Sequence, residues 1–180
     1  MQIIRNKMKI KDLIRCMLLG AAGIASKIII TPLVHMITGP LWIPGGVIAG
    51  GFYMFWLVFA RAHIKNKYAG SMTAFFQALM VLVSGSVASH GIISIITYTL
   101  PGIFVDLSFA FSKKISKEGI YIIAGILSNL IGFLGSNILF FNLPIIPLFT
   151  SAIIAMFSGS LGGLLALRIE NKMNGELEDE

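Results

Sequence analysis

Three long stretches of the chain contain no Asp, Glu, Lys or Arg: residues 28–60, 68–105 and 119–167. A helix that crosses the hydrocarbon core of a bilayer needs about 20 mostly apolar residues, so each stretch has room for about two spans. Only 12% of the 180 residues are charged, compared with about 25% in soluble globular domains. The sequence therefore predicts an all-α integral membrane protein.

Short segments rich in Gly, Pro, Ser and Asn divide each stretch in two; they are residues 38–46, 84–91 and 140–147. These residue types end helices and form turns. They predict a single six-helix transmembrane domain over residues 1–172, built as three helical hairpins. The spans are expected at about 12–36, 43–60, 69–86, 92–111, 119–140 and 148–168. An acidic tail is expected at residues 173–180, with disorder over its last residues, 176–180.

Basic residues lie in four clusters, within residues 5–15, 61–67, 113–117 and 168–172. In the predicted hairpins all of these clusters fall on the same side of the bilayer. Lys and Arg near span ends accumulate on the cytoplasmic side, so both termini are expected in the cytoplasm and the bundle in a prokaryotic plasma membrane. The net charge of +6 follows from this topology and does not indicate nucleic-acid binding.

Two charged residues, Lys27 and Asp106, lie away from the ends of the predicted spans, although a charge at mid-bilayer costs about 2.5–3.5 kcal/mol. Their expected depths differ by about 12 Å, so separate roles are expected rather than a direct ion pair. Lys27 either extends to the outer headgroups or lines a ligand pocket. Asp106 either caps or bridges the cytoplasmic end, to Lys113 or Lys114, or serves a ligand or coupling role.

Polar and small residues align at helical spacing on three predicted spans. The third span carries Thr73, Gln77 and Ser84; the fourth carries Thr99, Gly102 and Asp106, with Tyr98 beside them; the fifth carries Gly125, Asn129, Gly132 and Ser136, with Asn137 toward its outer end. Such stripes fit either a polar interior site or hydrogen bonds that only join helices. At the outer connections, Trp42, His90, Phe140 and Phe141 fit either a lid over a pocket or an ordinary interfacial belt.

Pairs of small residues four positions apart allow close helix packing in lipid. They occur here as Ala21/Ala25, Gly46/Gly50 and Gly159/Gly163. Packing within the bundle is the expected role of such pairs. At 100° per residue, however, Lys27 points about 120–160° away from Ala21 and Ala25. One face of the first span can therefore look inward while the alanine face meets a partner.

Enzymatic chemistry has weak support in the sequence. Ser86 and His90 are four residues apart, but their Gly- and Ser-rich segment is not a clear helix, and a serine nucleophile needs a base held within reach. The histidines lie on three different segments, which does not favour a metal site. No cofactor is expected. Without a Walker A sequence, any active transport needs an ATPase partner.

In its size, its six spans with cytoplasmic ends and the small-residue run 21-AAGIA-25, the chain resembles the S components of energy-coupling factor (ECF) transporters. Within that family, the segments 39-GPLWIPGG-46, 61-RAHIKNKYAG-70 and 102-GIFVD-106 look most like the thiamin-precursor branch, the YkoE-like proteins. The resemblance covers most of the chain.

The resemblance implies a site for a vitamin-like substrate in the outer half of the bundle. The implied substrate-binding residues are Gln77, His90, Tyr98, Asn129 and Asn137, with Trp42 as a lid residue. It further implies that Ala21 and Ala25 face a transmembrane coupling subunit, with two ATPase subunits below. Cobalt- and nickel-specific relatives begin with Met-His, whereas this chain begins Met1-Gln2, which counts against metal transport.

The leading hypothesis is a substrate-capture subunit of an ECF-type ABC importer. It would bind a vitamin or vitamin precursor, such as thiamin or hydroxymethylpyrimidine, and deliver it inward with ATPase partners. One alternative is a small membrane scaffold or assembly protein whose polar stripes only join helices. Another is a stand-alone channel.

Overall fold

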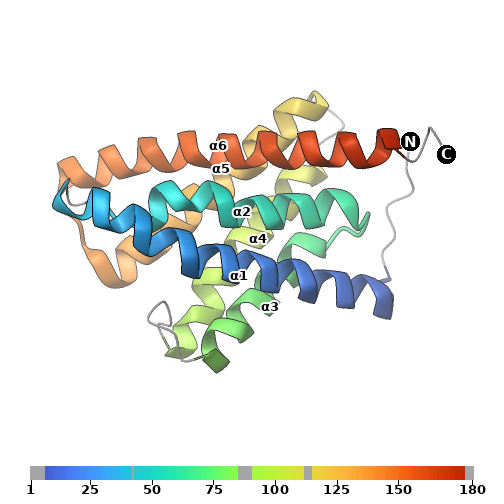
Figure 1. The fold of residues 1–180 in the computed structure, drawn as a ribbon, viewed down its shortest axis with the longest axis horizontal. Helices are drawn as coiled ribbons and strands as arrows, with labels where there is room; N and C mark the ends of the chain where they lie inside the picture. The colour runs from blue at the N-terminus through green and yellow to red at the C-terminus, as the bar shows by residue number, and fades with distance from the viewer. Residues whose placement is uncertain (1–6, 42, 85–90, 112–114, 177–180) are drawn as a thin grey trace.

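The computed structural model describes residues 7–41, 43–84, 91–111 and 115–176. Six α-helices account for most of these residues (Figure 1). They are α1 (Ile10–Thr38), α2 (Gly45–His63), α3 (Ala69–Ser84), α4 (Ser94–Ala110), α5 (Lys117–Ser136) and α6 (Ile145–Glu176). The predicted all-α, six-helix architecture is confirmed.

Within the described residues, five helical segments are long and apolar enough to cross a membrane. They are Ile10–Leu41, Gly45–His63, Gly91–Ala110, Lys117–Phe141 and Ile145–Gly175. The remaining apolar helix, α3, is described over 16 residues, and the expected end of its span at residue 86 lies outside the described residues. The chain is a multi-pass membrane protein.

The last helix is longer than expected. α6 begins at Ile145 and continues to Glu176, so the helix extends past the expected end of its span near residue 168 and reaches the first residues of the expected acidic tail. The segment after Arg168 contains no proline, so nothing in it interrupts the backbone hydrogen bonds of a helix. The Lys117 Nζ on α5 also donates a hydrogen bond to the Asn171 Oδ1, at 2.7 Å. This hydrogen bond holds the last turns of α6 against the start of α5.

The second helix lies at the centre of the bundle. α2 runs beside α1 and α6 (Figure 1) and contacts every other helix, while α3, α4 and α5 connect α1 to α6 around its remaining side. Within the apolar windows of the spans, 67% of the α2 window is buried but only 22% of the α1 window. α1 therefore presents most of its surface to lipid or to another protein.

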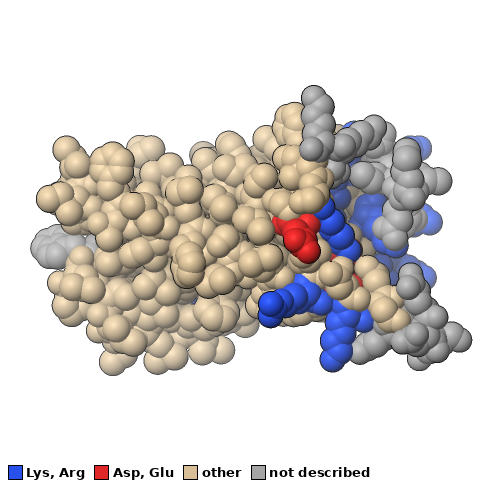
Figure 2. Space-filling model, turned by 90° about the horizontal axis from the view of Figure 1, so that it is seen from above, with Lys and Arg blue, Asp and Glu red and all other residues tan. Residues whose placement is uncertain are grey.

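Charged side chains gather at one end of the molecule, as Figure 2 shows. The start of α1 and the end of α6 lie at this same end (Figure 1). Because Lys and Arg accumulate on the cytoplasmic side of membrane proteins, this is the cytoplasmic end. The first turn of α1 and the last turn of α6 both lie there (Figure 1). The opposite end is the outer half of the bundle.

Glycines bring α5 and α6 into direct backbone contact. A Cβ atom added to Gly125 of α5 would lie 2.1 Å from the Gly159 carbonyl oxygen of α6, and one added to Gly163 would lie 2.1 Å from the Tyr121 carbonyl oxygen. Small residues permit such close approach between helices in lipid. The Gly159/Gly163 pair therefore packs within the bundle, as expected, whereas Ala21 and Ala25 are exposed on α1.

Candidate functional site

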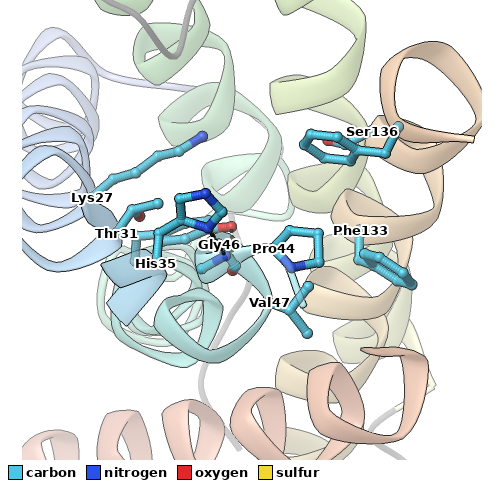
Figure 3. Close-up of a pocket in the computed structure, with 11 residues that line it drawn as sticks. Lys27, Thr31, His35, Pro44, Gly46, Val47, Phe133 and Ser136 are labelled. Carbon is cyan, nitrogen blue, oxygen red and sulfur yellow. Dashed lines mark hydrogen bonds between the residues drawn. The ribbon is translucent and has the colours of Figure 1, made fainter. Parts of the chain in front are cut away.

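A cavity of about 300 Å³ lies in the outer half of the bundle, between α1, α2 and the end of α5 (Figure 3). Its size is at the lower end of the range for small-molecule pockets. α1 and α5 both begin at the basic end, and their later turns contribute the lining, which places the cavity away from that end. The lining residues are Lys27, Thr31, His35, Pro44, Gly45, Gly46, Val47, Tyr53, Phe133, Ser136 and Phe141.

The Lys27 amine lies inside the bundle, between two aromatic rings. Its Nζ is 4.1 Å from the centroid of the Tyr98 ring and 5.2 Å from that of Tyr53, and it donates a hydrogen bond to the Tyr98 hydroxyl. Contacts of this kind stabilise a cation through the negative face of the ring. The Lys27 side chain therefore lines the cavity, with its amine held against Tyr98.

A second, much smaller pocket of about 30 Å³ adjoins the first, with room for about one water molecule. The two share Lys27, Tyr53 and Ser136, so the Lys27 amine stands where they meet. Gln77 and Tyr98, both expected in the substrate site, line the smaller pocket. Within the described residues, the buried Gln77 Nε2 has no hydrogen-bond partner. The structure thus brings Gln77, Tyr98 and Lys27 together.

Two polar residues of α1, Thr31 and His35, line the cavity although the sequence analysis did not select them. The Gly45 N–H donates to the His35 Nδ1 at 3.3 Å, so a neutral His35 ring carries its proton on Nε2. The Thr31 Oγ1 is buried without a partner among the described residues. Lys27, Thr31 and His35 are spaced by four residues and so share one face of the helix. That spacing is the signal that could have found them.

The structure places Asn129 and Asn137 outside the two pockets, in hydrogen bonds to backbone groups. Asn129 is 1% exposed, and its Nδ2 donates to the carbonyl oxygens of Val47 and Ala155, at 3.1 and 2.8 Å. These bonds join α5 to α2 and α6. The Asn137 Oδ1 accepts from the Leu143 N–H at 3.0 Å and orders the connection to α6. Neither side chain lines either pocket. Both amides instead form hydrogen bonds to backbone groups of neighbouring segments.

The two remaining candidates, Trp42 and His90, lie outside the described residues.

Asp106 forms a separate centre near the cytoplasmic end. Its carboxylate accepts hydrogen bonds from the Gly70 and Ser71 N–H groups, at 2.9 and 2.8 Å, and pairs with the Arg61 Nε at 3.3 Å. It therefore caps the first turn of α3, where an anion is favourable, and bridges to α2. A capping role was one of the two alternatives considered, but the basic partner is Arg61; Lys113 and Lys114 lie outside the described residues.

The lining of the cavity is a poor match for a metal ion. No group of three or more His, Cys, Asp or Glu that could hold a metal occurs within the described parts of the chain. The cavity itself contributes one imidazole, from His35, together with the Lys27 ammonium. Divalent transition metals prefer several imidazole, thiolate or carboxylate ligands, so this donor set suits an organic molecule better.

An apolar stripe runs along the exposed side of α1, which faces away from Lys27. Ala21 and Ala25 are exposed there, between Leu18 at 65% and Ile28 at 49% exposure. The spacing of these residues places them on one face of the helix.

Comparison with known proteins gives one match. No curated protein and no solved structure matches the chain. A family model described as "ABC-type cobalt transport system, permease component" matches residues 11–131, which include α1 to α4 and most of α5. The match covers more than half of the chain and agrees with its multi-pass helical fold. The chain therefore belongs to the family of permease components of ABC-type cobalt transport systems, which are membrane subunits of the ECF type and not enzymes.

Proposed function

We propose that this permease component captures a small vitamin-like molecule from outside the cell and delivers it inward with ATPase partners. The observation that carries the proposal is the cavity of about 300 Å³ in the outer half of the bundle. It combines aromatic walls with a few polar groups, which is the usual composition of a small-molecule site.

The cavity offers both stacking surfaces and hydrogen-bond donors. Tyr53, Phe133 and Phe141 supply rings, against which a planar heterocycle gains from stacking. Lys27 and His35 supply N–H donors for ring nitrogens, carbonyls or hydroxyls of such a ligand. A thiamin precursor such as hydroxymethylpyrimidine has this chemistry, and the resemblance to the YkoE-like branch favours it among vitamins.

Delivery needs partners, because the chain has no Walker A sequence with which to hydrolyse ATP. We place a transmembrane coupling subunit against the α1 stripe around Ala21 and Ala25, with two ATPase subunits below it. The stripe supports this placement because its small residues permit close contact with another helix. Reorientation of the bundle against that subunit would release the ligand inward.

Binding is tested by thermal unfolding of the purified protein against a panel of vitamins and their precursors. A ligand present at about 100 times its Kd stabilises the folded state by about 2.7 kcal/mol, which raises the unfolding temperature measurably. Failure of every compound to stabilise the protein would favour the scaffold alternative. Passage of solute into liposomes without ATPase subunits would instead favour the channel.

Gly46→Leu is expected to weaken binding of any stabilising compound by at least about tenfold, because the new side chain occupies the cavity. A Cβ at Gly46 would meet only the Tyr53 hydroxyl, at 3.8 Å, so the fold itself should tolerate the change. Gly135→Leu is the matched control, since a Cβ at Gly135 meets nothing within 4 Å and the residue does not line the cavity. Equal binding by the two variants would place the site elsewhere.

Ala21→Leu is expected to prevent assembly with the coupling subunit while ligand binding survives, because it adds bulk to the small face of α1. Co-purification with the coupling and ATPase subunits measures assembly, and thermal stabilisation measures binding. Val83→Leu, at a position of α3 that is 86% exposed, is the control and should assemble normally. Normal assembly of Ala21→Leu would show that another surface docks.

A further inference from the structure

We infer that the captured molecule carries an anionic group, a carboxylate or a phosphate, which pairs with the Lys27 ammonium inside the cavity. The inference deepens the proposed function and rests on it, because it concerns the ligand of the same site. It names the charge of the substrate, which neither the fold nor the family match specifies.

The first argument is that Lys27 has no acidic partner in the described parts of the chain. The ion pair found there joins Arg61 to Asp106, while the described contacts of the Lys27 amine are the Tyr98 hydroxyl and the rings of Tyr98 and Tyr53. An ammonium group has three N–H donors. The described contacts include one hydrogen-bond acceptor for this group, so two of its N–H donors can still bind an anionic ligand that enters the cavity.

The second argument is that the cavity offers hydrogen-bond donors but no carboxylate. The Lys27 side chain extends toward the space between α1 and α5, with Ser136 across from it (Figure 3). Thr31 has a buried hydroxyl without a described partner, and the neutral His35 ring carries its N–H on Nε2 because Nδ1 accepts from Gly45. No Asp or Glu is among the lining residues of either pocket. A ligand that brings a negatively charged acceptor group therefore fits this lining better than one that brings a positive charge.

The third argument is electrostatic. A carboxylate or phosphate that enters beside Lys27 makes charge-assisted hydrogen bonds, which are roughly twice as strong as neutral ones. A bare divalent cation or a cationic vitamin would instead bring a second positive charge toward the ammonium at low dielectric, where repulsion is strong. The cavity thus selects against free cobalt ions and against thiamin itself, and favours a neutral or apolar ring that bears an anionic substituent.

The test compares matched pairs of probes by thermal unfolding of the purified full chain. The pairs are nicotinate with nicotinamide, pyridoxine 5′-phosphate with pyridoxine, and hydroxymethylpyrimidine phosphate with hydroxymethylpyrimidine. We expect the anionic member of at least one pair to bind at least about tenfold more tightly than its neutral partner. The pair that responds tells whether the group is a carboxylate or a phosphate.

Three variants connect this preference to the amine. Lys27→Met should abolish the difference within the responding pair, Lys27→Arg should retain it, and Lys11→Met, an exposed lysine on the same helix, should leave it unchanged. Unfolding temperatures without ligand show whether each variant folds; if Lys27→Met does not, Lys27→Gln, which removes the charge but keeps a polar end group, should abolish the difference while Lys27→Arg retains it. Cobalt(II) chloride serves as the cationic probe. We expect it not to raise the unfolding temperature through the cavity, so that any shift it causes should be the same in the wild-type protein and in Gly46→Leu.

The possible failures are distinct. If no probe of either charge stabilises the wild-type protein, the proposed function fails together with the inference. If neutral members bind as tightly as anionic ones, or if Lys27→Met keeps the charge preference, the inference alone is overturned. A cobalt-induced shift that depends on the cavity also overturns it.

Discussion

Asp106→Leu is expected to destabilise the folded bundle by about 3–5 kcal/mol, because it leaves a buried charge without its partner. The side chains of Arg61 and Asp106 are 5% and 9% exposed, so water cannot replace the lost carboxylate. The change also removes the acceptor for the N–H groups of Gly70 and Ser71 at the start of α3. Unfolding of the detergent-solubilised protein, followed by circular dichroism against denaturant, measures the loss.

Two companion variants separate charge from capping. Asp106→Asn keeps an oxygen acceptor for the first turn of α3 but removes the charge, so it should lose less stability than Asp106→Leu. Arg61→Met combined with Asp106→Leu removes both charges and should recover part of the loss, because apolar replacement of a buried pair is often neutral. A double variant no more stable than Asp106→Leu would mean that capping accounts for the effect.

The same variants address the other role considered for Asp106. If Asp106→Asn folds with nearly wild-type stability, binds ligand and assembles, but fails to transport it in liposomes with its ATPase partners, Asp106 takes part in coupling. If transport falls only in proportion to stability, its role is structural. The hydrogen bonds to α3 and the ion pair to α2 favour the structural outcome.

Gly125→Ala is expected to destabilise the bundle by about 3 kcal/mol, the upper part of the usual range for overpacking. The new methyl group would lie 2.1 Å from the Gly159 carbonyl oxygen, and a backbone atom cannot rotate away as a flexible side chain can. α5 and α6 would have to separate along their whole crossing. The measurement is the same denaturant unfolding of the purified protein.

The control for this variant lies on the same helix. A Cβ at Gly135 meets no atom within 4 Å, so Gly135→Ala should be neutral or should stabilise the protein by up to about 1 kcal/mol through helix propensity. Opposite signs for two identical substitutions on α5 would establish close backbone packing as the cause. Equal effects at the two positions would contradict the α5–α6 contact described above.

The sequence pointed to three residues that line the two pockets, Lys27, Gln77 and Tyr98, but not to Thr31 and His35. Gln77 and Asn129 are both amides on polar helical stripes, yet Gln77 lines a pocket and Asn129 joins three helices. Helical periodicity tells which residues share a face, not what that face meets. Thr31 and His35 follow Lys27 at four-residue spacing, but an otherwise apolar span gives no sign in the sequence that this face meets a cavity rather than lipid.

The sequence by itself determined that the chain is an all-α membrane protein of six helices, five of them long and apolar enough within the described residues to cross a membrane, and its basic clusters predict that both ends face the cytoplasm. Hydrophobic length and flanking charge act on each span separately, so no knowledge of neighbouring helices is needed. Only the tertiary structure decided that Lys27 lies between Tyr53 and Tyr98 and that Asp106 pairs with Arg61. Those contacts depend on the rotation and approach of each helix against the others, which side-chain packing at long sequence separation sets.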